Sequence, residues 1–321
     1  MNSRRSFIKT VGTGAALSAF APQLLSAREQ ELKNLRIGII GAENSHTIGF
    51  GKMFNIDKKF PSAEVKYVWG ETDEFARNAA EKGNIPHIVK DPGEMLGKID
   101  ALIVDHRHAK YHLEAATPFI KEGIPTFVDK PFCYRAAEGE EFLELARELG
   151  TPVTSYSTIA QSAVTFDMKE QVASMENIRQ VVRSGPVDMD SKYGGIFFYG
   201  VHIVQPLMYM FGEDIEKVRV TREGPKGSAN LVYKNGLFAT LIFKDAYGWE
   251  TFVETEEEFM ELESSVEESD PALCYTDMVE MFRTGKEPRT HESILNCVRV
   301  LEALEKSVAS QKWEEVATES S

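Results

Sequence analysis

The six residues Phe127-Val128-Asp129-Lys130-Pro131-Phe132 set the frame for interpreting this 321-residue chain. The apolar residues before Asp129 predict a short buried strand, and Pro131 ends it because proline has no backbone N–H for a neighbouring strand. Lys130 is then left at the carboxyl end of the strand, the edge at which open α/β sheets bind ligands. A lysine there can hold a phosphate or a substrate hydroxyl, or act as an acid or base; a surface lysine at a strand end is the alternative.

Strand and helix patterns alternate on both sides of this stretch. Apolar, strand-like runs lie at residues 35–41, 63–69 and 101–104, and helical spacing is found at about 45–54, 73–82, 111–122 and 136–149. Strands alternating with helices of this length predict right-handed βαβ units and a parallel sheet. We therefore expect an α/β fold that begins with a Rossmann-like domain at residues 34–152.

From about residue 153 the pattern changes. Extended segments are expected at 180–187, 217–221, 229–233, 237–244 and 250–254, with the hairpin signal Asn235-Gly236 between two of them. Helices are expected at 163–175, 270–282 and 292–311. This pattern predicts an α+β domain at residues 153–321 whose sheet is open and mainly antiparallel.

The first 27 residues are similar to a twin-arginine export signal. Ser3-Arg4-Arg5-Ser6-Phe7-Ile8-Lys9 precedes a weakly apolar run, and Leu25-Ser26-Ala27 offers small residues for cleavage. Polar residues interrupt the run, which is shorter than the roughly 20 apolar residues that a membrane span needs. We therefore expect a signal at 1–27, a linker at 28–33, a periplasmic location and no stable membrane insertion.

Charge and cysteine content restrict the partners further. The chain has 36 basic and 50 acidic residues, a net charge of −14 that becomes −17 without residues 1–27. This charge argues against nucleic acid and anionic membranes as partners. Cys133, Cys274 and Cys297 lack metal or haem spacing, which predicts buried thiols, with one disulfide as the alternative.

Three segments together resemble the Gfo/Idh/MocA family of NAD(P)-dependent sugar and cyclitol oxidoreductases. They are Leu35–Gly41, Asp129-Lys130-Pro131, and Gly194-Gly195 followed by His202. The resemblance covers nearly the whole chain after residue 33. It implies hydride transfer between NAD(P) and a secondary hydroxyl of a sugar or cyclitol, with Lys130 bonding the reacting oxygen and His202 exchanging its proton, in a homo-oligomer.

The expected phosphate-binding turn departs from the family pattern. Gly41 opens the turn, but Glu43 and His46 occupy the positions of the second and third glycines of the dinucleotide fingerprint. Asn44 and Ser45 are suited to cap a helix whose N-terminus faces a phosphate, and His46 adds a donor.

Two further positions bear on the cofactor. Glu71 follows the second strand, where a carboxylate accepts from ribose hydroxyls and repels a 2′-phosphate, so we expect NAD, with NADP as the alternative. The cluster Asp105-His106-Arg107-His108, with His112, is interpreted as a loop lining the cofactor or substrate rather than a metal site, because no second cluster supplies ligands. The expected cofactor contacts are Gly38, Gly41, Asn44, Ser45, His46, Glu71, His108, Asp129 and Lys130.

The second chemical signature differs from the family at one position. Family members usually have an aspartate four residues before the histidine, and here Phe198 stands there. His202 then either works alone with Lys130 or has Asp188 or Asp190 in compensation. Tyr193 and Tyr199 are expected to stack on a sugar, with a core role as the alternative. The expected substrate contacts are Lys130, Asp188, Asp190, Tyr193, Tyr199 and His202.

Two alternative functions stay open from the sequence. Glu43 and Phe198 favour a sugar-binding relative that keeps the fold but has lost catalysis. Export to a compartment without free nicotinamide nucleotides favours an enzyme that recycles bound NAD, giving net elimination or hydrolysis of a glycoside. The presence of Lys130 and His202 favours an active oxidoreductase.

Overall fold

The computed structural model describes residues 34–267 and 270–318. The expected export signal at 1–27 and linker at 28–33 lie outside these residues. None of the helices in the described residues combines the length and hydrophobicity that a membrane crossing requires. Cys133 and Cys297 are free, buried thiols, as one of the two interpretations predicted.

The first sheet of the described chain has six parallel strands in the order β3-β2-β1-β4-β5-β6. This is the strand order of a dinucleotide-binding Rossmann fold, so the fold prediction is confirmed. The strands are β1 (Leu35–Ile40), β2 (Ala63–Trp69), β3 (His87–Ile88), β4 (Ala101–Val104), β5 (Thr126–Val128) and β6 (Val153–Thr154).

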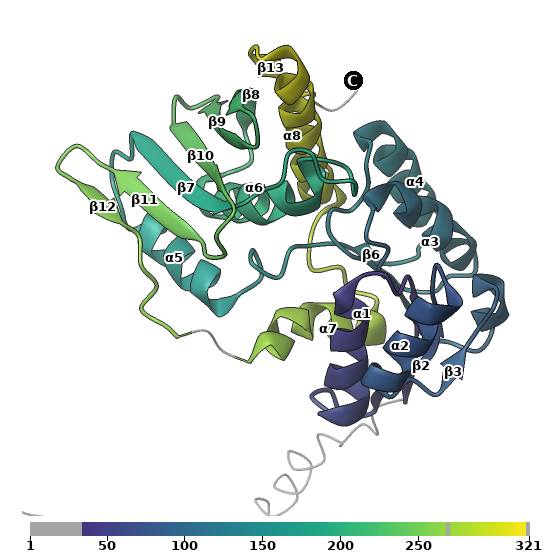
Figure 1. Ribbon diagram of the computed structural model, residues 1–321. Helices are drawn as coiled ribbons and strands as arrows, with labels where there is room; N and C mark the ends of the chain where they lie inside the picture. The colour runs from purple at the N-terminus through teal and green to yellow at the C-terminus, as the bar shows by residue number, and fades with distance from the viewer. Residues whose placement is uncertain (1–33, 268–269, 319–321) are drawn as a thin grey trace, which may run out of the picture. The chain divides into compact units, whose positions relative to one another are not determined.

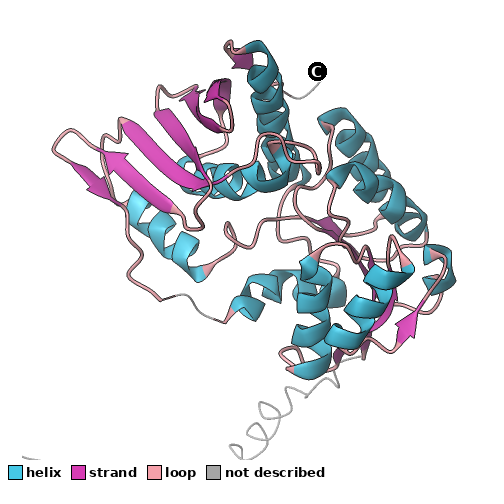
Figure 2. Cartoon of the chain, viewed as in Figure 1, coloured by secondary structure: helices cyan, strands magenta, loops and turns pink. Residues whose placement is uncertain are grey.

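Helices cover both faces of the first sheet, as Figure 2 shows. Side chains alternate along each strand, so Ile37 and Ile39 join one buried cluster while Ile40 joins the other. The helical segments around this sheet are α1 (Ser45–Gly51), η1 (Lys52–Ile56), α2 (Asp73–Gly83), η2 (Pro92–Met95), η3 (Ala109–Tyr111), α3 (His112–Lys121) and α4 (Ala136–Leu149).

The second sheet has seven described strands in the order β12-β11-β7-β10-β9-β8-β13 (Figure 1). It is mainly antiparallel, as predicted, but β7 and β10 run parallel. Its strands are β7 (Gln180–Pro186), β8 (Ile215–Glu223), β9 (Lys226–Tyr233), β10 (Phe238–Lys244), β11 (Glu250–Glu254), β12 (Phe259–Glu261) and β13 (Glu314–Glu315). The later helices are α5 (Ala163–Ala173), α6 (Phe197–Phe211), η4 (Pro271–Tyr275), α7 (Thr276–Thr284) and α8 (His291–Ser310).

Some segments differ from the sequence prediction. His87 and Ile88 form the edge strand β3, which was not among the expected strands. Strand β6, which lies at the expected start of the second domain, pairs with β5 in the first sheet. Met278 and Val279 of α7 are buried in the same cluster as Ile37 of β1. A late helix therefore completes the hydrophobic cover of the first sheet. The domain division between residues 152 and 153 stays a prediction.

Strand register brings the site residues to one edge. Ile40 pairs with Val104, and Val104 pairs with Val128, so the next residue of each strand projects from the same carboxyl edge. Backbone hydrogen bonds continue this alignment, because Asp105 N donates to Ile40 O (2.7 Å) and Asp129 N donates to Val104 O (2.8 Å). The last pairs of the sheet thus set Asp105 and Asp129 side by side.

The contact between α1 and α2 leads to a stability prediction. A Cβ at Gly51 would lie 2.5 Å from Gly83 Cα, whereas a Cβ at Gly49 of the same helix would meet nothing within 4 Å. We expect Gly51→Ala to lower the free energy of unfolding by about 1–3 kcal/mol, because overpacking forces the helices apart. Gly49→Ala, the matched control, should raise it by about 0.5–1 kcal/mol. Urea denaturation measures both, and equal effects would contradict the proposed close contact.

Candidate active site

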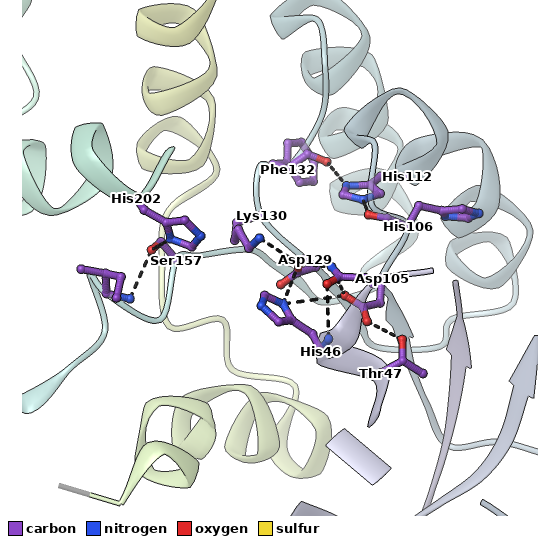
Figure 3. Close-up of polar contacts among 12 residues, drawn as sticks. His46, Thr47, Asp105, His106, His112, Asp129, Lys130, Phe132, Ser157 and His202 are labelled. Carbon is purple, nitrogen blue, oxygen red and sulfur yellow. Dashed lines mark hydrogen bonds and ion pairs between the residues drawn. The ribbon is translucent and has the colours of Figure 1, made fainter. Parts of the chain in front are cut away.

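Two buried carboxyl groups form the centre of the site. Asp105 is fully buried, and Asp129 is 2% exposed (Figure 3). The amide of Asn44 joins them, since its Nδ2 donates to Asp105 Oδ1 (2.9 Å) and to Asp129 Oδ2 (3.2 Å). A single amide group therefore holds the ends of β4 and β5 together at the start of α1.

The hydrogen bonds indicate that Asp105 carries a proton. Burial, and then the charge of Asp129, raise the pKa of Asp105 well above its usual value. Thr47 Oγ1 lies 2.8 Å from Gly41 O and 2.5 Å from Asp105 Oδ2. A hydroxyl has one hydrogen, so if it donates to Gly41 O, the second contact needs a carboxyl proton that Asp105 donates to Thr47. Both observations favour a neutral Asp105.

Asp129 is the anionic member of the pair. Burial acts to raise its pKa, but the charges of His46 and Lys130 outweigh burial and hold the pKa below its usual value. His46 Nδ1 lies 3.1 Å and Lys130 Nζ 3.7 Å from Asp129 Oδ2. One ligand-type atom each of His46, Asp105 and Asp129 lies within 4.8 Å of the others, as in metal sites. Here the carboxyl oxygens are already surrounded by the proton of Asp105, the Asn44 amide and the Lys130 ammonium group. We therefore interpret these residues as a hydrogen-bond network rather than a metal site.

His112 and His106 lie in buried positions after β4. His112 is fully buried, which lowers its pKa, and its Nε2 donates to the carbonyl of His106 at 2.8 Å. Its Nδ1 lies 3.2 Å from the carbonyl of Phe132, so the ring braces the loop after β4 against the segment after Lys130. Burial also lowers the pKa of His106 to about 3. His106 Nδ1 is buried without a hydrogen-bond partner among the described residues.

The turn after β1 fits a dinucleotide at Glu71. Glu71 Oε2 accepts from the backbone N–H groups of Ala42 and Glu43, both at 2.9 Å. Its other oxygen, Oε1, is buried and has no partner in the described part of the chain. A buried acceptor without a donor is costly unless a ligand supplies the hydrogen, and a ribose hydroxyl is such a donor. The residues present therefore fit NAD at the end of β2.

The glycines and the altered fingerprint positions have distinct roles. Gly41 has φ +107°, and a Cβ there would lie 2.6 Å from the backbone of Asp105, so the turn requires glycine. Gly38, by contrast, packs inside β1, where a Cβ would lie 2.8 Å from Met95 Sδ. Asn44 caps α1, of which Ser45 is the exposed first residue, by accepting from His46 N.

The carboxylate of Glu43 is held away from its own turn. Glu43 Oε1 accepts a hydrogen bond of 2.6 Å from the hydroxyl of Tyr193, in the segment before α6. The guanidinium of Arg107 lies over the Tyr193 ring at 4.3 Å and over the Phe198 ring at 5.3 Å. The residue at the second fingerprint position thus joins the phosphate-binding turn to the segment that carries the second signature.

Lys130 and His202 lie near each other in Figure 3, and the charge of Lys130 acts on the His202 ring. Lys130 is 7% exposed, follows β5, precedes a cis peptide bond to Pro131, and has its ammonium 5.7 Å from the centre of the Phe198 ring. His202 Nδ1 lies 2.7 Å from Ser157 Oγ, which also accepts from Ile159 N at 3.2 Å. Burial, and then the charge of Lys130, lower the pKa of His202 well below 6.5, so its ring is neutral.

The remaining predicted residues are divided between this site and other contacts. Tyr199 packs edge-on against His202, with ring centres 5.5 Å apart. His108 lies against Gly194: a Cβ added at residue 194 would lie 3.2 Å from the His108 ring. Asp190 forms an ion pair with Arg222 (2.6 Å), and Asp188 accepts from Asp190 N. The structure does not bring these two aspartates to His202, and Phe198 stacks with Lys130 where the family aspartate would stand.

Sequence reasoning placed Asp105 and Arg107 in a loop lining the cofactor or substrate, but it did not predict the pairing of Asp105 with Asp129. Ser157 was missed altogether. The partners of Ser157 and Arg107 are 45 and 86 residues away in the chain, so no local pattern indicates these contacts. Only the packing of the two sheets brings these pairs together.

Comparison with known proteins agrees with this geometry. A family model described as the oxidoreductase family with an NAD-binding Rossmann fold, Gfo/Idh/MocA, matches residues 35–157. The chain is 27% identical over 188 residues to the uncharacterized oxidoreductase YhhX of Escherichia coli K12, a match that covers 53% of this chain. It spans about half of that relative, 54% of its length.

Two solved structures share the fold over most of the chain. GenD2 from gentamicin A biosynthesis, solved with NAD, is 13% identical with a TM-score of 0.76, covering 97% of this chain and all of the other. The scyllo-inositol dehydrogenase of Lactobacillus casei, solved with NAD(H) and scyllo-inositol, is 14% identical with a TM-score of 0.74, covering 89% of this chain and all of the other. Residues 35–157 of this chain therefore match the model of the NAD-binding Rossmann domain of the Gfo/Idh/MocA oxidoreductases.

Proposed function

We propose that this protein is an NAD-dependent oxidoreductase that acts on a secondary hydroxyl of a sugar or cyclitol. The observation that carries the proposal is the position of Lys130, whose buried ammonium group lies at the carboxyl edge of the NAD-binding sheet beside a neutral His202. The inositol bound by the similar dehydrogenase is consistent with a polyol substrate.

In this proposal the chain positions the substrate and handles one proton. Glu71 and the turn after β1 would hold NAD, which would supply the acceptor for the hydride of the carbinol carbon. The Lys130 ammonium donates a hydrogen bond to the substrate oxygen and stabilises the negative charge that develops there. His202 Nδ1 lies 2.7 Å from Ser157 Oγ, and in the tautomer in which Nδ1 donates to Ser157, Nε2 is unprotonated and can take the hydroxyl proton. Asp129 keeps the ammonium group oriented at the strand end.

The role of Lys130 predicts a selective loss of turnover. We expect Lys130→Met, which keeps most of the side-chain volume but removes the charge, to lower kcat about 10²- to 10⁴-fold with normal NAD content. Lys121→Ala, at an exposed lysine in the last turn of α3, is the control and should leave kcat unchanged. Steady-state assays with a panel of polyols, together with NAD released on denaturation, measure both. Normal turnover in Lys130→Met would refute the assignment, and a wild-type protein without NAD or turnover would favour the sugar-binding relative.

The low pKa of His202 predicts the pH dependence of oxidation. A base whose pKa is lowered stays unprotonated as the pH falls through 6.5, so kcat/KM should not decline around that pH. The acid-side loss should begin only below it. A pH–rate profile checks this, with the exposed His87 replaced by Gln as the control. An inflection near 6.5 in the wild type that vanishes in His202→Gln would contradict a buried neutral base.

Glu71 predicts the choice of cofactor. Glu71→Ala removes the acceptor for ribose hydroxyls and the charge that would repel a 2′-phosphate. We expect NAD to bind about tenfold or more weakly and the preference over NADP to shrink. Titration of the apoprotein with each nucleotide measures this, and Glu74→Ala, in the first turn of α2, is the control. An unchanged ratio of NAD to NADP affinity in Glu71→Ala would exclude this role.

A further inference from the structure

A cavity of about 380 Å³ lies next to the proposed proton-handling residues. Its walls come from the start of α5, from Arg183 of β7, from Tyr247 and Trp249, and from residues 271–275. Thr158, which follows Ser157, also lines it. Trp249 lines this cavity and also contacts His202, since the centres of the two rings lie 5.8 Å apart. The volume is in the range of small-molecule sites.

Arg183 places a buried positive charge in the wall of this cavity. The residue is 2% exposed on the inner face of β7, where the pattern of buried positions otherwise holds small or apolar residues. Its Nη1 donates to Thr251 Oγ1 at 2.6 Å, but its Nε is buried without a partner among the described residues. Burial lowers its pKa to about 10, which leaves it a cation at neutral pH.

No carboxylate of the described chain forms an ion pair with this guanidinium. The charge of Glu250 acts on Arg183, but its carboxylate is bonded to Lys244 and Ser184. A buried charge without a counter-ion costs several kcal/mol, roughly, so natural chains rarely retain one that has no function. The charge is explained if a ligand brings the missing anion.

Trp249 supplies a second unused donor to the same cavity. Its Nε1 is buried and has no hydrogen-bond partner in the described residues. The ring fits because Gly185 has no side chain, and a Cβ there would lie 2.4 Å from the indole. The two residues that carry these unused donors, one of them a cation, therefore line a cavity otherwise bounded largely by apolar groups such as Ile159 and Met168.

We propose that this cavity binds the carboxylate group of the substrate, so that the enzyme acts on a polyhydroxylated acid rather than a neutral polyol. Arginine holds carboxylates through adjacent N–H groups, and Nε is one of these donors. Trp249 then lies between the carboxylate and the reacting carbinol near His202. This inference rests on the proposed oxidoreductase function and names its substrate class.

Matched acids and neutral polyols test the inference without relying on turnover. Isothermal titration calorimetry of the full protein with D-gluconate and D-glucuronate is compared with D-glucitol and D-glucose, which lack the carboxylate. We expect the wild type to prefer the acids by about 10- to 100-fold, the range for a hydrogen bond to a buried charge. Arg183→Met should abolish this preference, whereas Arg179→Met, at an exposed arginine that pairs with Glu256, should keep it.

Two further variants keep the test decisive if Arg183→Met fails to fold. Arg183→Lys retains the charge but loses the planar donor set, and Trp249→Phe loses the indole N–H together with the five-membered ring that carries it, so each should weaken acid binding several-fold. Equal affinity for acids and neutral polyols in the wild type, or unchanged acid binding in all three variants, would overturn the inference. Oxidation of neutral cyclitols without any preference for acids would overturn it while leaving the proposed function intact. Arg183-dependent acid binding by a protein that takes up no NAD would instead overturn the proposed function and leave only the carboxylate site.

Discussion

The site depends on placing two carboxyl groups side by side in the interior. Asp105 and Asp129 follow paired strands whose register is fixed by the sheet, so neither can move away from the other. Two buried anions this close would repel strongly, and the pair is tolerable because one of them holds a proton. The Asn44 amide, the Thr47 hydroxyl and the His46 ring then fit around a pair with one negative charge. The start of α1 is thereby tied to β4 and β5.

The single charge of that pair determines how Lys130 and His202 are used. With Asp105 neutral, Asp129 alone balances the Lys130 ammonium, which lies 3.7 Å away and is otherwise surrounded by Phe198 and buried groups. Burial, and then the positive charge of Lys130, lower the pKa of His202, so its ring is neutral. A neutral imidazole beside a fixed ammonium is suited to take a proton from an oxygen that the ammonium polarises. The division of roles therefore follows from the charge balance at the strand ends.

The sequence predicted the parts of this arrangement that local patterns determine. Alternating apolar runs located the parallel sheet, and Asn235-Gly236 located a hairpin. The Asp129-Lys130-Pro131 motif located the lysine at a strand end. What it could not predict depends on contacts between distant segments. Ser157 contacts His202, which is 45 positions away in the chain, and Tyr193 contacts Glu43, which is 150 positions away. The burial of α7 against β1 similarly needs the packed sheets, because its amphipathic pattern does not say which sheet it covers.

The replacement of the family aspartate by Phe198 fits the positive character of the site. An aspartate at this position would add a negative charge near Lys130 and would stabilise a protonated His202. Phe198 instead offers a ring face to Lys130 and Arg107, which attracts cations without neutralising them. Arg183 adds a buried positive charge that no described carboxylate pairs, although the chain as a whole carries −14. This unpaired charge would repel a cationic ligand and gains nothing from a neutral one. It is balanced when the substrate itself is an anion.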